Sequence, residues 1–157
     1  MTQRTKSVVL AEIEKAMTAL SRGPRIKRLH QFLNLKAGGT LDRPAYVTLD
    51  CLEECGPMRI SELAKACGVD VSTVSRLVDH LSATGLVEPG GESHDGRVVI
   101  LRVSDGGKKL LRRLKTVRRD ALVRLLSDWP EEDQEAFARL LSRFVESLER
   151  LTSWREL

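Results

Sequence analysis

Apolar side chains recur at helical spacing along most of the chain, and the pattern is most regular between residues 60 and 84. A first helix is predicted over 60–67, where four apolar positions follow the i, i+3, i+4, i+7 spacing of a helix with one buried face. These positions are Ile60, Leu63, Ala64 and Cys67. Gly68 then favours a helix end, and Asp70 favours the start of a new helix.

A second helix is predicted over 71–84, because its apolar residues repeat the same spacing. These residues are Val74, Leu77, Val78 and Leu81. Two short helices joined by a tight turn that contains glycine predict a helix-turn-helix, whose second helix is suited to the major groove of DNA. The polar face of that helix, with one serine from the first, supplies the candidate DNA-contacting side chains. They are Ser61, Ser72, Thr73, Ser75, Arg76 and His80.

A β-hairpin is predicted directly after the second helix. Residues 86–88 predict a short strand, and residues 98–103 predict a second strand. Between them, residues 89–91 and 94–96 have the proline, glycine and aspartate content that is typical of turns. The loop is therefore expected to be longer than a two-residue turn. The segment 58–60 is short enough to be a further strand that pairs with this hairpin.

A charged pair lies at the edge of the hairpin loop. Arg97 follows Asp95 closely, so the carboxylate can hold the guanidinium at a fixed angle. An arginine on a projecting loop beside a major-groove helix is well placed to enter the adjacent minor groove. Asp95 and Arg97 therefore join the candidate DNA-binding residues. The alternative is a surface hairpin whose charged pair is incidental.

These motifs resemble those of the multiple-antibiotic-resistance (MarR-type) regulators. The resemblance is carried, in order and register, by residues 60–64, 72–79, 85–88, 95–97 and 101–107. It implies a fold that is mainly α with a small β-hairpin wing. In that fold a winged helix-turn-helix is flanked by N- and C-terminal dimerisation helices.

Two positions depart from the pattern of that family. Gly96 stands where the family often has a second arginine, so the wing is expected to make one minor-groove contact fewer. Arg22-Gly23-Pro24 interrupts the first helix, so that helix is not expected to be straight.

Apolar stripes predict more helices on both sides of the central motif. They are expected over 7–20, 26–35 and 41–54, then from Ser104, which caps a long helix, to Trp129-Pro130, and finally from Pro130 to about Trp154. The third of these is expected to bury Ala45, Leu49 and Leu52. These helices carry more apolar surface than one small bundle needs, which favours a homodimer. The alternative is a monomer whose terminal helices cover its own core.

The length of the chain suits one domain. We expect a single MarR-like domain over 1–157, with a winged DNA-binding lobe at 41–104. A helical dimerisation region is expected at 1–35 and 105–157.

The distribution of charge favours a polyanionic partner. The chain has a net charge of +4. Residues 102–124 contain nine Lys or Arg and two Asp, whereas residues 131–150 contain six acids and three Arg. Positive charge is thus expected beside the wing and the helix that follows it. The sequence contains no run of 18 apolar residues, so a cytoplasmic protein without a membrane partner is expected.

The sequence gives little support to catalysis, a cofactor or a metal site. It contains no glycine-rich phosphate loop between a strand and a helix, and no serine with a poised histidine. Its three cysteines have no CxxC spacing. Cys51 and Cys55 are four residues apart and share a helix face, which leaves an oxidation-sensing repressor as an alternative. Nearby Glu53 and Glu54 disfavour a thiolate, and three buried structural thiols are expected instead.

The expected function is a homodimeric DNA-binding transcriptional regulator, a repressor that a small-molecule effector releases from a palindromic operator. An effector pocket is implied by the resemblance, with His30, Phe32 and Tyr46 as candidate contacts. A winged-helix module whose second helix contacts protein is a further alternative. The small polar and basic side chains of that helix suit phosphates and base edges better than they suit a protein.

Overall fold

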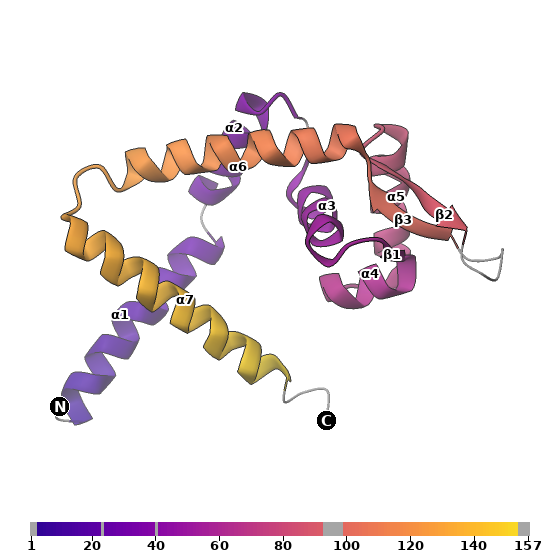
Figure 1. The fold of residues 1–157 in the computed structure, drawn as a ribbon. Helices are drawn as coiled ribbons and strands as arrows, with labels where there is room; N and C mark the ends of the chain where they lie inside the picture. The colour runs from indigo at the N-terminus through magenta and orange to yellow at the C-terminus, as the bar shows by residue number, and fades with distance from the viewer. Residues whose placement is uncertain (1–2, 23, 40, 93–98, 154–157) are drawn as a thin grey trace. The chain divides into compact units, whose positions relative to one another are not determined.

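The computed structural model describes residues 3–22, 24–39, 41–92 and 99–153 (Figure 1). The elements in chain order are α1 (Gln3–Arg22), α2 (Pro24–Lys36), α3 (Arg43–Cys55), β1 (Met58–Arg59), α4 (Ile60–Cys67), α5 (Val71–Ala83), β2 (Val87–Glu92), β3 (Val99–Val103), α6 (Asp105–Leu125) and α7 (Glu131–Ser153). The predicted fold class, mainly α with a small β-hairpin wing, is confirmed. The chain forms two compact units, residues 1–117 and residues 118–157, and α6 runs through both.

The core of the first unit is built from α3, α4, α5, the sheet and the start of α6. The large side chains that are fully buried there are Leu49, Leu52, Leu63, Leu81, Leu114 and Val74. The predicted inward faces of α3, α4 and α5 are therefore confirmed. Burying each such side chain stabilises the fold by about 1.5–3 kcal/mol.

Helix α3 begins two residues later than the sequence predicted. Asp42 is its N-cap, since the carboxylate Oδ1 accepts the Ala45 N–H at 2.9 Å. Pro44 lies in the first turn, where no helical N–H bond is lost. Leu41 lies in the preceding loop and is buried. Its apolar side chain therefore packs into the core although it is not part of the helix.

The three strands form an antiparallel sheet in the order β1-β3-β2. The predicted strand at 58–60 is confirmed, because Met58 pairs with Leu101 and Arg59 with Ile100. The prediction of a turn at 89–91 is wrong, since these residues continue β2, with a register shift between Pro89 and Glu92. Because β2 lies at the sheet edge, it tolerates proline. A Cβ on Gly90 would also lie 3.3 Å from Cγ2 of Ile100, so the bulged strand approaches β3 closely.

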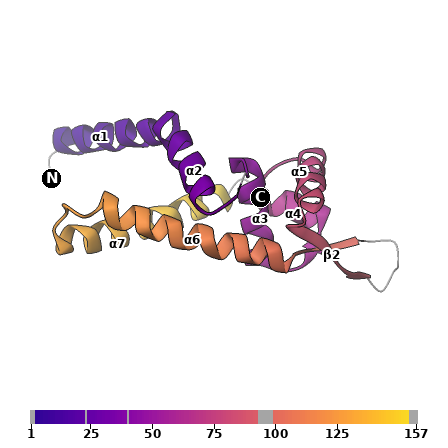
Figure 2. The same cartoon turned by 90° about the horizontal axis from the view of Figure 1, so that it is seen from above.

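The predicted interruption of the first helix separates α1 from α2. Helix α1 ends at Arg22 and α2 begins at Pro24, and the two helices run in different directions in both views (Figures 1 and 2). Proline is favoured at the first position of a helix, which explains where α2 starts.

Both terminal helices expose apolar faces. The exposed apolar side chains of α1 are Val8, Val9, Leu10, Ile13, Met17 and Leu20. Those of α7, in the second unit, are Phe137, Leu140, Leu141, Phe144, Val145, Leu148 and Leu151. The described helices include none with the length and apolar character that a membrane crossing requires.

Candidate nucleic-acid interface

The turn between α4 and α5 sets the direction of the second helix. Gly68 adopts a left-handed conformation, with φ 68° and ψ 29°, and its N–H bonds to the carbonyls of Ala64 and Lys65. The Val69 N–H also bonds to the Ala64 carbonyl, at 3.1 Å. Asp70 is then extended and caps α5, as the sequence predicted. This turn lets both helices place their apolar faces in one core.

The predicted DNA-contacting residues of α5 lie on its outer face. Ser72, Arg76 and His80 are exposed, while Thr73 and Ser75 are half-buried. The opposite face carries the buried residues Val74, Val78 and Leu81. Ser61 is exposed on α4 and lines a hollow of about 620 Å³ together with Asp79, Ser82 and residues of the sheet. The helix therefore presents hydroxyl, guanidinium and imidazole groups to water, and among the described residues no carboxylate forms an ion pair with Arg76.

Asp70 binds both hydroxyl groups at the start of α5. Its Oδ1 accepts the Thr73 N–H at 2.8 Å and the Ser72 hydroxyl at 2.5 Å, and its Oδ2 accepts the Thr73 hydroxyl at 2.7 Å. These hydrogen bonds hold the pKa of the Asp70 carboxyl well below its usual range, and the bond from Ser72 has the largest effect. The carboxylate therefore stays ionised at neutral pH. In the free protein the two hydroxyl hydrogens point to Asp70, and the hydroxyl oxygens remain available as acceptors.

Sequence reasoning identified Asp70 only as a cap. The signal for the wider cluster was present, because hydroxyl side chains two and three residues after an aspartate are the common partners of such a carboxylate.

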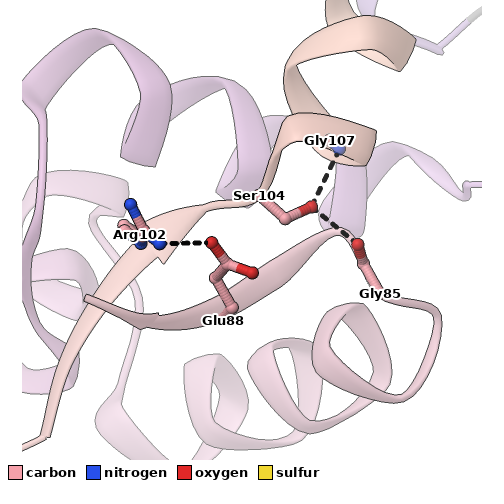
Figure 3. Close-up of polar contacts among 5 residues, drawn as sticks. All are labelled: Gly85, Glu88, Arg102, Ser104 and Gly107. Atoms are coloured by element: carbon pink, nitrogen blue, oxygen red, sulfur yellow. Dashed lines mark hydrogen bonds and ion pairs between the residues drawn. The ribbon is translucent and has the colours of Figure 1, made fainter. Parts of the chain in front are cut away.

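A buried serine joins the wing to the helices on either side (Figure 3). The Ser104 hydroxyl donates to the Gly85 carbonyl at 2.6 Å and accepts the Gly107 N–H at 3.0 Å. The Ser104 N–H donates to the Leu86 carbonyl at 3.0 Å. The predicted cap of the long helix is thus confirmed. The same residue also fixes the end of β3 against the residues that follow α5.

The wing carries one ion pair in its described part. Arg102 on β3 lies opposite Glu88 on β2, and the two side chains are 2.8 Å apart (Figure 3). Both side chains are about half exposed, so water and salt screen the attraction. Asp95 and Arg97 lie outside the described residues, and their role stays a prediction.

A hollow of about 450 Å³ lies beside the outer face of α5. It is lined by Thr73, Arg76, Leu77 and His80 from α5, and by Asp42 and Pro44 from the start of α3. The sequence did not predict that the start of α3 lies beside the outer face of α5, because the two segments are about 30 positions apart in the chain.

A second cavity, of about 470 Å³, lies between α2 and the start of α3. Its lining is Ser21, Pro24, Ile26, Lys27, His30, Gln31, Leu41, Asp42, Arg43 and Pro44. Of the three candidate effector contacts, only His30 is in this lining. Tyr46 is buried, its ring lies 5.7 Å from that of His30, and its hydroxyl donates to Asp50 at 2.6 Å. Phe32 is exposed, with the Lys36 ammonium 5.7 Å from its ring centre.

The cysteines differ in exposure, so the prediction of three buried thiols is wrong for one of them. Cys51 and Cys67 are half-buried against the core, whereas Cys55 is exposed. Cys51 and Cys55 are four residues apart and share a face of α3. Cys55 is more exposed to solvent because it is the last residue of the helix. Burial, followed by a hydrogen bond with Cys67, raises the pKa of the Cys51 thiol to about 12. Among the described residues, no group of three His, Cys, Asp or Glu side chains could hold a metal ion.

Comparison with known proteins places this arrangement in a family. Residues 41–99 match the model of the MarR family. The helix-turn-helix transcriptional regulator YxaD of Bacillus subtilis strain 168 is 35% identical over 108 residues, which is 69% of this chain and 76% of YxaD. The helix-turn-helix transcriptional repressor IacR of Pseudomonas putida is 29% identical over 111 residues, or 71% of this chain and 66% of IacR.

The fold is also that of solved structures. A MarR family protein from Bacillus stearothermophilus superimposes with a TM-score of 0.77 at 24% identity, covering 95% of this chain and 99% of that one. The match extends over the terminal helices as well as the winged lobe.

Proposed function

This chain belongs to the MarR family of DNA-binding transcriptional regulators, and from that premise we propose that it is a homodimeric repressor that a small molecule releases from a palindromic operator. The relative IacR is named a repressor, which supports repression over activation as the function of this chain. The chemistry of the site supports binding to DNA and not enzymatic activity.

The observation that carries the proposal is the outer face of α5. Arg76 is exposed without an ion pair among the described residues, and it stands between the hydroxyls of Ser72 and Thr73 and the imidazole of His80. An arginine on a major-groove helix can bond O6 and N7 of guanine together, while small hydroxyl groups suit phosphates and base edges. A helix that docked on protein would instead expose apolar anchors.

Dimer formation is supported by the apolar faces of α1 and α7. Six apolar side chains of α1 and seven of α7 are exposed in a single copy of the chain, counting described residues. Contiguous apolar patches of this kind mark association surfaces. Two copies related by a twofold axis would present two α5 helices to two half-sites, which explains a palindromic operator.

Release by a small molecule is supported by the cavity between α2 and α3. Its walls include the apolar side chains of Pro24, Ile26 and Leu41, and its charged lining is two cations, Lys27 and Arg43, and one carboxylate, Asp42. A volume of about 470 Å³ lies in the range of ligand sites. An apolar interior with more cations than carboxylates suits a small organic acid.

The proposal is tested by binding of the full chain to duplex DNA over a range of salt concentrations. We expect selection from a random duplex library to yield a palindrome, and binding to that duplex to weaken steeply with salt. Each phosphate contact contributes about −0.9 to the slope of log affinity against log salt. Binding that is insensitive to salt, or selection that returns no common sequence, would contradict the proposal.

A further inference from the structure

The outer face of α5 carries one negative charge. Asp79 is exposed, and it is the only acid in the sequence of α5. Among the described residues it forms no ion pair. Phosphates repel a carboxylate, so Asp79 weakens binding to DNA unless it gains a hydrogen bond in the complex.

Asp79 completes the stripe of side chains that α5 can present to a groove. Residues at i, i+3, i+4 and i+7 share one face of a helix, and helices in the major groove read base edges with such a face. In α5 this stripe consists of Ser72, Ser75, Arg76 and Asp79. Asp79 is three residues beyond Arg76, or about 4.5 Å along the helix axis. Base pairs are about 3.4 Å apart, so the two side chains reach neighbouring pairs.

Asp79 and Arg76 border different hollows. Asp79 lines the hollow of about 620 Å³ with Arg59, Ser61 and Ser82, whereas Arg76 lines the one of about 450 Å³. Within the described part of the chain the two side chains form no ion pair with each other, so both charges are available to DNA. The exposed guanidinium of Arg59 offsets part of the repulsion between Asp79 and the phosphates.

The chemistry of base edges selects one partner for this carboxylate. In the major groove only cytosine N4 and adenine N6 are hydrogen-bond donors. Adenine also presents the N7 acceptor beside its amine, and that acceptor repels a carboxylate oxygen. Cytosine therefore suits Asp79 best.

We propose that Asp79 reads a cytosine in each half-site by accepting a hydrogen bond from its N4 amine, at the base pair next to the one that Arg76 contacts. This inference rests on the proposed function. A duplex that offers no amine at this position repels the carboxylate. Asp79 thus raises specificity and lowers affinity for random duplex.

Selection from a random duplex library with the full chain gives the first test. Wild type should prefer cytosine at least tenfold at a position adjacent to the base pair whose preference Arg76→Ala relaxes. Asp79→Ala should reduce this preference to less than twofold and raise affinity for random duplex. Glu54→Ala is the matched control, because it removes an exposed carboxylate outside α5. It should leave the base preference unchanged.

A base analogue identifies the atom that Asp79 contacts. The selected cytosine is replaced in both half-sites by 2-pyrimidinone, which lacks the N4 amine, and melting checks that the duplex is intact at the assay temperature. Wild type should lose affinity at least tenfold, and Asp79→Ala less than twofold. In Asp79→Asn, whose side chain has the same shape, cytosine should no longer be preferred over adenine, because an amide both donates and accepts.

Arg59→Ala separates reading by Asp79 from an indirect effect through Arg59. The Glu62 carboxylate accepts the backbone N–H of Arg59 at 2.8 Å, and this bond at the start of α4 does not need the guanidinium. Arg59→Ala should therefore weaken binding to all duplexes alike and keep the preference for cytosine.

Four results would overturn the inference. They are a selected palindrome without the expected cytosine, a cytosine preference that survives in Asp79→Ala or Asp79→Asn, equal losses of wild type and Asp79→Ala on the analogue duplex, and loss of the preference in Arg59→Ala. If the wild-type chain selects no sequence at all, the proposed function itself fails, which separates the two failures.

Discussion

The exposed face of α5 is mainly polar, whereas the exposed faces of the terminal helices α1 and α7 are apolar. In α5 the apolar residues Val74, Val78 and Leu81 are buried, and the exposed residues are polar apart from Val71 and Ala83 at its two ends. In α7 the apolar stripe is exposed, with Leu140 at 58% and Leu151 at 69%. The polar face of α5 is well solvated in water and suits a charged partner. The apolar face of α7 is unfavourably exposed in water, so covering it with another apolar surface would be stabilising.

The difference also has an energetic consequence. Covering the seven exposed apolar side chains of α7 would contribute on the order of 10 kcal/mol before the entropic cost of association. Contacts of α5 with base edges contribute about 1–3 kcal/mol each. The terminal helices should therefore control whether the protein binds a palindrome tightly, and α5 should control which palindrome it binds.

The largest effect is expected when a charge is placed on the apolar face of α7. Leu140→Asp should give monomers in analytical ultracentrifugation, because a carboxylate buried without a partner is costly. Affinity for a palindromic duplex should fall about 10²–10⁴-fold, since the two half-sites are no longer linked.

Ser142→Asp is the matched control, because residue 142 is exposed on the same helix and is already polar. It should leave both mass and affinity unchanged. A monomeric Leu140→Asp chain with full affinity for the palindrome would contradict the role assigned to the terminal helices.

The second prediction concerns close packing within the winged lobe. A Cβ on Gly107 would lie 2.3 Å from the Leu86 carbonyl oxygen and 2.6 Å from Cγ1 of Val103. Gly107→Ala should therefore lower the free energy of unfolding by about 3 kcal/mol, as measured by urea denaturation at fixed protein concentration.

Gly106 provides the comparison, since a Cβ there would meet its nearest atom at 3.3 Å. Gly106→Ala should change stability by less than about 1 kcal/mol, because alanine favours the helix while the contact is tight. A small effect of Gly107→Ala, equal to that of Gly106→Ala, would show that the close contact of Gly107 with Leu86 and Val103 tolerates a side chain.

Local patterns explain how much of the lobe was predictable. The buried faces of α4 and α5 follow from spacing within each helix, and Asp70 and Ser104 cap helices because their side chains reach N–H groups three residues away. The continuation of β2 through Gly90 could not be predicted, because the same proline and glycine residues suit a turn or a bulged edge strand.

The parts of the site that the sequence did not reveal depend on packing between distant segments. Asp42 and Arg76 line one hollow only because α3 and α5 pack together. The exposure of Cys55 likewise depends on where α3 ends against the core, which spacing along one helix cannot specify.

The third prediction addresses base reading by α5. Arg76→Ala should weaken binding to the selected palindrome by about 2 kcal/mol per half-site and relax the preference for one base pair. Binding to random duplex should weaken less. Arg76→Lys is the sharper variant, because it keeps the charge and loses the bidentate geometry. If Arg76→Lys keeps the full base preference, Arg76 contacts phosphate and does not read a base.

The fourth prediction concerns the carboxylate at the start of α5. The pKa of Asp70 is lower in the folded protein than in the unfolded chain, so Asp70 stabilises the fold above its unfolded pKa of about 4. This contribution should be lost as pH falls through the folded pKa. The difference in stability between wild type and Asp70→Ala should therefore be constant from pH 5 to 7 and shrink below pH 4.

Asp70→Asn separates the cap from the charge. It should keep most of the stability and raise affinity for random duplex, because a negative charge near the phosphates is removed. A stability difference between wild type and Asp70→Ala that grows toward low pH would contradict the assigned direction of the pKa shift.

The smallest effect is expected for oxidation. With a pKa of about 12, the Cys51 thiol is protonated at neutral pH and reacts poorly with peroxide, whereas Cys55 is exposed on the same helix. Wild type, Cys51→Ser and Cys55→Ser should bind the selected palindrome alike before and after mild peroxide. Iodoacetamide should modify one thiol of the folded chain quickly, and Cys55→Ser should abolish that fast reaction. Release of wild type from DNA by peroxide, with retention of Cys55→Ser, would instead establish the oxidation-sensing alternative and place its sensor at the end of α3.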